Sequence, residues 1–83
     1  MRFNYGPHAL ENLVERRLDR AWIERTVIDP DSTELDPNHP QRVRAYRVVP
    51  ERDGRVLRVV YVPENGGCRI VTAFLDRGRR SRT

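Results

Sequence analysis

The chain has 83 residues, which is enough for one domain with a small core. Its 37% hydrophobic and 34% charged residues are typical of a soluble globular domain and exclude a largely disordered chain. No apolar run approaches the roughly 20 residues that span a bilayer, and the first residues carry no apolar secretory segment. We therefore expect a cytoplasmic protein that does not contact a membrane.

The positive charge is unusual in kind and in position. All 16 basic residues are arginines, and arginine binds phosphate through two parallel hydrogen bonds without losing its proton. Four of them fall within residues 77–83, which hold no acid, so 12 arginines balance 12 acids in the rest of the chain. We therefore divide the chain into a single domain over residues 1–76 and a basic tail over residues 77–83, and expect the tail to be a loose arm.

Two helices are predicted near the start of the chain. Pro7 suits a first helical turn, and apolar residues recur at helical spacing from Leu10 to Leu18. Asp19 is a typical N-cap for a second helix over residues 20–28, and Pro30 ends that helix.

Strands are predicted after Pro30, where the hydrophobic period changes to alternation. The predicted strands are a short edge strand at residues 32–36 and three long strands over residues 42–49, 56–62 and 68–75. Asp53-Gly54 and Asn65-Gly66 are typical of two-residue hairpin turns. This order predicts an α+β fold in which two N-terminal helices pack on one face of an antiparallel sheet of three or four strands.

The first turn also predicts which side chains share a face. With a two-residue turn Arg52 pairs with Arg55, and Tyr46 then lies opposite Tyr61 on the helix side. Arg47 and Arg58 share the other face, which we expect to be uncovered because arginines are rarely buried without a partner. We predict that these two arginines form an anion-binding centre. The register of the last strand stays open, because a three-residue second turn would reverse its faces.

Other polar residues have weaker assignments. His8, at the start of the first helix, is a general base, a structural residue or merely an exposed one. Tyr46 stacks on a base, moves a proton or packs in the core. Cys68 is expected to be a small apolar residue, because no base is predicted beside it. His8, His39 and Cys68 are too few and too scattered for a metal site, so we expect no metal and no other cofactor.

Several of these short elements together resemble a known bacterial family. They are an early His-Ala, an arginine one or two turns later, an Asp-capped helix ending at Asp-Pro, a strand with Arg and Tyr, a Leu-Arg-Val-Val-Tyr-Val strand, and an Ile-Val-Thr-Ala-Phe strand before basic residues. The pattern resembles the family called domain of unknown function 4258, grouped with the BrnT and RelE-like toxins of toxin–antitoxin pairs. The resemblance covers nearly the whole chain and implies a RelE/BrnT-like fold.

The resemblance also implies site residues. By matching position it implies roles in RNA cleavage or binding for His8, Arg17, Arg44, Tyr46, Arg47, Arg58 and Arg77. Of these we take His8, Tyr46, Arg47 and Arg58 as the catalytic candidates and the other three as RNA-binding. The predicted sheet face and the basic tail add Arg69, Arg79 and Arg80 as RNA-binding candidates. The chain has no lysine, so any step that better-known toxins assign to lysine must use arginine or be absent.

RNA is a suitable substrate for such a site because it carries its own nucleophile, the 2′-hydroxyl. A protein needs only to align this group, stabilise charge on phosphorus and transfer protons. We therefore predict a metal-independent endoribonuclease that acts as a toxin and is restrained by a cognate antitoxin protein. The alternative is a non-catalytic module on the same fold that binds RNA or a protein. The sequence leaves the oligomeric state open.

Overall fold

The computed structural model describes residues 1–80 of the chain. Its elements, in chain order, are β1 (Arg2–Tyr5), α1 (Pro7–Glu15), α2 (Arg20–Ile28), β2 (Ser32–Leu35), β3 (Val43–Val49), a 3₁₀ turn (Pro50–Arg52), β4 (Arg55–Glu64) and β5 (Gly67–Arg80). The strands form one five-stranded sheet in the order β1-β5-β4-β3-β2. The α+β class, both helices and the short strand before the three long ones are confirmed.

Two features of the sheet differ from the prediction. β1 was missed, and it pairs in parallel with β5, so the sheet is mixed rather than purely antiparallel. β5 continues through Arg80 and is not a loose arm after residue 75. The remaining tail residues, 81–83, lie outside the described residues.

The local sequence explains where both helices begin or end. The Asp19 side chain accepts a hydrogen bond from the Ala21 N–H at 2.9 Å and caps α2, as predicted. α1 ends where Arg17 adopts a left-handed conformation with φ of 52°. There the Leu18 N–H donates to the Leu13 carbonyl at 2.9 Å and the Arg17 N–H to the Val14 carbonyl at 3.3 Å, which is a Schellman motif.

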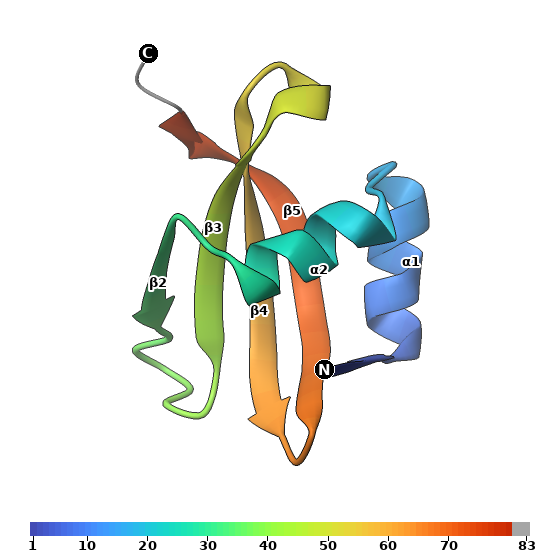
Figure 1. Ribbon diagram of the computed structural model, residues 1–83, viewed down its shortest axis with the longest axis vertical. Coiled ribbons are helices and arrows are strands. Elements are labelled where there is room, and N and C mark those ends of the chain that lie inside the picture. The colour runs from blue at the N-terminus through green and yellow to red at the C-terminus, as the bar shows by residue number, and fades with distance from the viewer. Residues whose placement is uncertain (81–83) are drawn as a thin grey trace.

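The two helices cover one face of the sheet. α2 crosses in front of the central strands and α1 lies along the β5 side (Figure 1). Ile23 from α2 and Leu57 and Val59 from β4 are fully buried between the two layers. The opposite face of the sheet, which no helix covers, we call the helix-free face.

The β3–β4 hairpin does not have the predicted two-residue turn. Val49 pairs with Arg55, and residues 50–54 form a longer loop in which Asp53 and Gly54 have φ of 57° and 73°. The register therefore differs from the prediction by three residues. Because side chains alternate along a strand, an odd shift exchanges the two faces of β3. Tyr46 lies opposite Arg58 and not opposite Tyr61.

The β4–β5 hairpin has the predicted turn. Glu64 pairs with Gly67 and Tyr61 with Ile70, as the Asn65-Gly66 turn requires. One residue farther on, Val71 forms a bulge, which moves the later register by one, so that Arg58 pairs with Phe74. Cross-strand partners share a face, so Tyr46, Arg58 and Phe74 lie side by side on the helix-free face.

No helix among residues 1–80 is both long enough and apolar enough to cross a membrane.

Candidate functional site

Arginines and aromatic rings alternate across the helix-free face. The Arg79 guanidinium lies 3.7 Å from the centre of the Tyr46 ring, and the Arg58 guanidinium lies 5.9 Å from that ring and 5.2 Å from Phe74. Arg16 completes the series at 5.8 Å from Phe74. All four distances are within cation–π range. We call the five residues Arg79, Tyr46, Arg58, Phe74 and Arg16 the arginine–aromatic row.

The sheet order explains how five residues far apart in sequence form one row. Tyr46, Arg58 and Phe74 are direct neighbours on β3, β4 and β5. Arg16 follows the end of α1, where its Nη1 donates to the Ala73 carbonyl at 2.9 Å and to the Asn12 Oδ1 at 2.7 Å. Arg16 therefore satisfies a backbone carbonyl of β5 while its charge lies beside Phe74.

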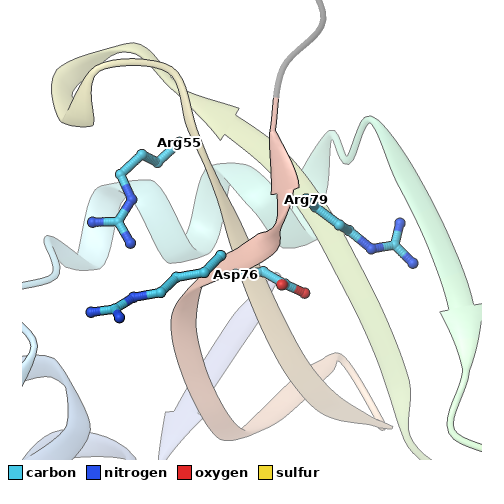
Figure 2. Close-up of a pocket in the computed structure, with 4 residues that line it drawn as sticks. Arg55, Asp76 and Arg79 are labelled. Atoms are coloured by element: carbon cyan, nitrogen blue, oxygen red, sulfur yellow. The ribbon is translucent and has the colours of Figure 1, made fainter.

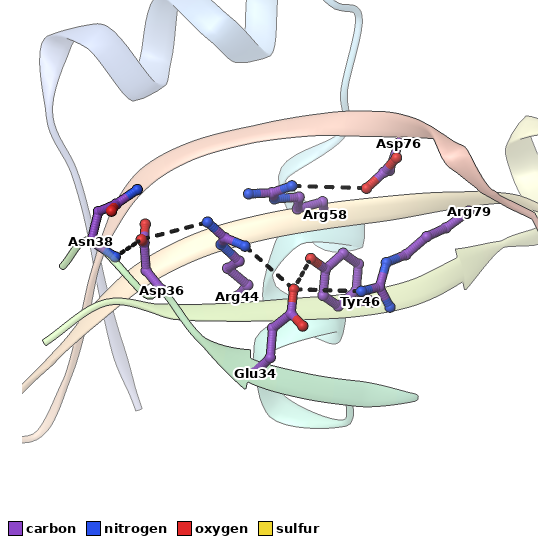
Figure 3. A network of polar contacts seen from close by, with 8 residues as sticks. All are labelled: Glu34, Asp36, Asn38, Arg44, Tyr46, Arg58, Asp76 and Arg79. Carbon is purple, nitrogen blue, oxygen red and sulfur yellow. Dashed lines mark hydrogen bonds and ion pairs between the residues drawn. The ribbon is translucent and has the colours of Figure 1, made fainter. Parts of the chain in front are cut away.

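Carboxylates from β2 and the loop after it hold one end of the row. The Tyr46 hydroxyl donates to the Glu34 Oε1 at 2.6 Å, and the same oxygen lies 3.5 Å from Arg44 and 3.4 Å from Arg79 (Figure 3). Arg44 also pairs with Asp36 at 3.5 Å. Arg44 and Arg79 thus each share their charge with an acid, and their side chains are held in defined positions.

These contacts change the protonation of the groups involved. The hydrogen bond from Tyr46, followed by the arginines beside it, lowers the pKa of the Glu34 carboxyl. The backbone N–H of Asn38 does the same for the pKa of Asp36. Burial, followed by the bond to Glu34, raises the pKa of the Tyr46 hydroxyl. At neutral pH the two acids are therefore charged and the tyrosine keeps its proton.

Arg58, at the centre of the row, is only weakly neutralised. Its only ion pair within residues 1–80 is with Asp76 at 3.9 Å, which is beyond hydrogen-bond distance. Its buried Nε atom has no hydrogen-bond partner in that part of the chain. The side chain is still 23% exposed, so an external acceptor such as a phosphate oxygen can reach it from solution.

Arg47 does not belong to this face, and its predicted pairing with Arg58 is wrong. It lies opposite the buried Leu57, on the helix side of the sheet. Its Nη1 donates to the carbonyl oxygen of Asp29, the residue that ends α2, and lies 3.1 Å from the Asp29 carboxylate. Arg47 therefore neutralises the negative C-terminal end of α2, which is a structural role. The prediction failed because the hairpin loop reverses the faces of β3.

Two other candidates lie away from the row. His8 is exposed in the first turn of α1, and no hydrogen bond or ion pair joins it to the helix-free face within the described residues. Arg17 follows α1, and its carbonyl oxygen accepts a hydrogen bond from Arg52 at 3.1 Å. Its left-handed backbone ends a helix, so the structure gives it a conformational role.

The remaining RNA-binding candidates divide into three groups. Arg44 and Arg79 contact Tyr46 or its partner Glu34, so the structure brings them together with Arg58. Arg69 lies at the other end of the sheet, near the β4–β5 turn, and pairs with Glu64 at 3.4 Å. Arg77 is exposed at the end of β5, and the backbone of Arg80 pairs with Arg55.

Sequence reasoning missed four members of the site. They are Arg16, Glu34, Phe74 and Asp76. Shifting the predicted pairing of β4 with β5 by one residue would have placed Phe74 beside Arg58. The bulge at Val71 causes this shift, and no clear pattern in the sequence predicts the bulge. Tyr46 was expected on the helix side, whereas it lies on the helix-free face and is only 3% exposed because Arg79 covers its ring.

No group of three or more His, Cys, Asp or Glu side chains within residues 1–80 is arranged to hold a metal ion. The single cysteine, Cys68, is buried, and its burial raises the pKa of the thiol. A protonated, buried thiol is a packing residue rather than a nucleophile.

The fold and the face define a small two-layer α+β protein with a cationic, aromatic sheet surface. Its sequence matches a family model described as a domain of unknown function, DUF4258, over residues 5–75. The chain therefore belongs to the DUF4258 family, as the sequence pattern predicted. No curated protein and no solved structure matches it.

Proposed function

We propose that this protein binds single-stranded RNA across its helix-free face. The observation that carries this proposal is the arginine–aromatic row, in which Arg79, Arg58 and Arg16 alternate with two rings. Guanidinium groups neutralise phosphates, and their flat surfaces stack on bases that have been separated from their neighbours.

The geometry favours a single strand over a duplex. Recognition of double-stranded RNA relies mostly on phosphate and sugar contacts along the helix, whereas here the charges are interleaved with rings along one line. The arginines of the row are also fixed in advance, Arg79 by Glu34, Arg58 by Asp76 and Arg16 by the Ala73 carbonyl, so little side-chain entropy is lost on binding. These acids reduce the net charge of the face, so stacking should contribute to affinity alongside simple charge attraction.

A binding experiment with matched charge changes tests this proposal. The fluorescence anisotropy of a labelled ten-nucleotide RNA is measured with the wild type, Arg58→Gln, Arg79→Gln and the control Arg47→Gln. Loss of a charge-assisted contact should weaken binding about tenfold for each of the first two variants. Arg47→Gln removes the same charge from the opposite face and should retain the affinity per folded molecule. Equal losses in all three variants would show that only net charge matters and would contradict the proposal.

The second candidate function is RNA cleavage, as in the BrnT and RelE-like toxins that the sequence resembles. The observation in its favour is the 2.6 Å hydrogen bond between Tyr46 and Glu34, beside Arg44 and Arg79 on the same face. A charged carboxylate and a protonated hydroxyl form a complementary base and acid, and the arginines would stabilise charge on phosphorus.

Glu34 and Tyr46 can account for both proton transfers of the proposed cleavage reaction. Glu34 accepts the proton of the 2′-hydroxyl, whose oxygen attacks the adjacent phosphorus, while Tyr46 donates its proton to the departing 5′ oxygen. The products are a 2′,3′-cyclic phosphate and a 5′-hydroxyl, and the proton then returns from Glu34 to Tyr46 along their hydrogen bond. Arg79 covers the Tyr46 ring and pairs with Glu34, so we expect cleavage to require displacement of Arg79 by the bound RNA.

Cleavage is tested separately from binding. The wild type should cut RNA in the presence of a chelator and should not cut a strand with 2′-deoxy sugars. The Glu34→Gln variant should cut RNA at least about a hundredfold more slowly than the wild type, which is the typical size of an acid–base contribution. Induced expression should stop growth if the protein is a toxin, and co-expression of an antitoxin from a neighbouring reading frame should restore growth. Binding without cutting would leave the first proposal standing and remove this one.

A further inference from the structure

A hollow of about 400 Å³ lies at the end of β5, beside the arginine–aromatic row. Arg55, Asp76, Arg77 and Arg79 line it (Figure 2). Three of these four side chains carry a positive charge. The hollow is therefore a strongly cationic feature at the point where the row ends.

An interruption in the pairing of β5 produces this arrangement. Val56 pairs with Asp76 and Arg55 with Arg80, so residues 77–79 are extra residues on β5. The Asp76 Oδ1 accepts a hydrogen bond from the Gly78 N–H at 2.9 Å, which fixes the turn of these three residues. Arg79 then reaches the Tyr46 ring, while Arg55 reaches the hollow from β4.

Among residues 1–80, two of the three arginines that line the hollow have no acidic partner. Asp76 is the only acid that lines it, and its two oxygens already contact the Gly78 N–H and the Arg58 guanidinium. Arg79 pairs with Glu34. Neither Arg55 nor Arg77 has an ion-pair or side-chain hydrogen-bond partner among residues 1–80, in contrast to Arg44, Arg47, Arg58 and Arg79.

We propose that this hollow binds the terminal phosphate monoester of an RNA strand, with Arg55 and Arg77 as its ligands. A monoester carries about −1.5 to −2 charge at pH 7 and three acceptor oxygens, so it suits two uncompensated guanidinium groups better than an internal diester with a single charge. The proposal rests on the proposed RNA-binding function, because the hollow adjoins the row through Arg79. It adds a preference for strands that end in phosphate.

The experiment compares four ten-nucleotide RNAs of one sequence. They carry a 5′-phosphate, a 3′-phosphate, hydroxyls at both ends, or a 5′-phosphate blocked as its methyl ester, and their Kd values are measured by anisotropy with the full chain. One phosphate-ended strand should bind about tenfold more tightly than the hydroxyl-ended strand, and the gain identifies which end occupies the hollow. If the 5′ end is the one bound, methylation should remove most of the gain.

Variants then assign the gain to the hollow. Arg55→Gln with Arg77→Gln should bring the preference for the phosphate-ended strand close to one, whereas Arg42→Gln, at the opposite end of the sheet, should keep it. Thermal unfolding confirms that each variant is folded, and Arg77→Gln alone, an exposed change, should already reduce the preference.

The outcomes separate the two proposals. Equal binding of all four strands by the wild type overturns the phosphate site and leaves the RNA-binding face intact. Tight binding of a phosphate-ended strand without binding of the hydroxyl-ended strand supports the hollow and contradicts the face. A preference that survives the double variant also overturns this inference.

Discussion

Arg17 has an unfavourable backbone conformation for its residue type. It occupies the left-handed position that ends α1, where glycine is the usual residue because it has no Cβ. Its side chain makes no hydrogen bond or ion pair within the described residues, so nothing there offsets the strain. The position therefore reduces the stability of the fold.

Arg17→Gly should stabilise the protein by about 0.5–1 kcal/mol. The left-handed conformation costs an ordinary residue roughly 1–2 kcal/mol, and the greater entropy of glycine in the unfolded chain offsets part of the gain. Urea denaturation measures the change in the free energy of unfolding. Arg17→Ala is the matched control, because it removes the same side chain and keeps the Cβ. Equal stability of the two variants would contradict the explanation.

At the scale of elements, β1 approaches β5 too closely for a side chain at one position. A Cβ on Gly67 would overlap the carbonyl oxygen of Arg2, which belongs to the backbone of β1. The Arg2 N–H also donates to the Gly66 carbonyl at 2.9 Å, so the two strands are held together there. Only glycine fits at position 67.

Gly67→Ala should destabilise the fold by about 1–3 kcal/mol, which is the usual cost of overfilling a packed site. The amide protons of β1 should exchange faster, because the strand must move away from β5. Hydrogen exchange followed by NMR measures this, and Gly6→Ala, where a Cβ meets open space, is the control. Unchanged protection of residues 2–5 would refute the close approach as the cause.

β2 is an edge strand whose attachment depends on charge. Its Glu34 binds Tyr46 and two arginines, and Asp36 just after it binds Arg44. The folded-state pKa values of both acids are lowered, so these contacts stabilise the fold above the unfolded carboxyl pKa of about 4 and are lost as the pH falls through the lower folded values.

Acidification below about pH 4 should therefore loosen β2 before the rest of the sheet. The chemical shifts of residues 32–35 should move at a higher pH than those of β4, and Glu34→Gln should remove most of this dependence. Simultaneous changes in β2 and β4 would mean that the network does not hold the edge strand on its own.

The sequence predicted individual elements better than their pairing. Helices and strands were predictable because their hydrophobic periods, the Asp19 cap and the Pro30 stop act over a few residues. The face of Tyr46 was not, because it depends on whether residues 50–54 form a short or a long loop, and Pro50 begins a 3₁₀ turn that the Asp53-Gly54 pattern conceals. β1 was missed because its partner is more than sixty residues away.

Strand pairing also limited how much of the candidate site could be predicted. Arg44, Tyr46, Arg58 and Arg79 were predicted as functional and do lie together, although Tyr46 was assigned to the wrong face. The face predicted for Arg47 was wrong, because a three-residue change in register places it on the helix side of the sheet. Glu34 and Asp76 could not be recognised, because an acid acquires its partners only when strands are aligned.

For the whole molecule, residues 77–80 at the end of β5 are part of the sheet and complete the candidate site. Arg79 covers Tyr46 and pairs with Glu34 on the edge strand β2. A chain ending at Asp76 should therefore lose about 0.5–2 kcal/mol of stability, the range for a cation–π contact, besides RNA affinity. A chain ending at Arg80 is the control and should match the wild type in thermal stability. Unchanged stability of the shorter chain would show that Arg79 contributes nothing to the fold.

The parallel pairing of β1 with β5 has a consequence for synthesis on the ribosome. The first strand to emerge can find its partner only after residues 67–70 have been made, so the helices and β1 must wait without a complete sheet. Arg58, Phe74 and Arg79 likewise meet only when β5 folds onto β4. During translation, therefore, the arginine–aromatic row is absent from the nascent chain until β5 has been made, and the RNA binding that we propose for the row has to wait until then.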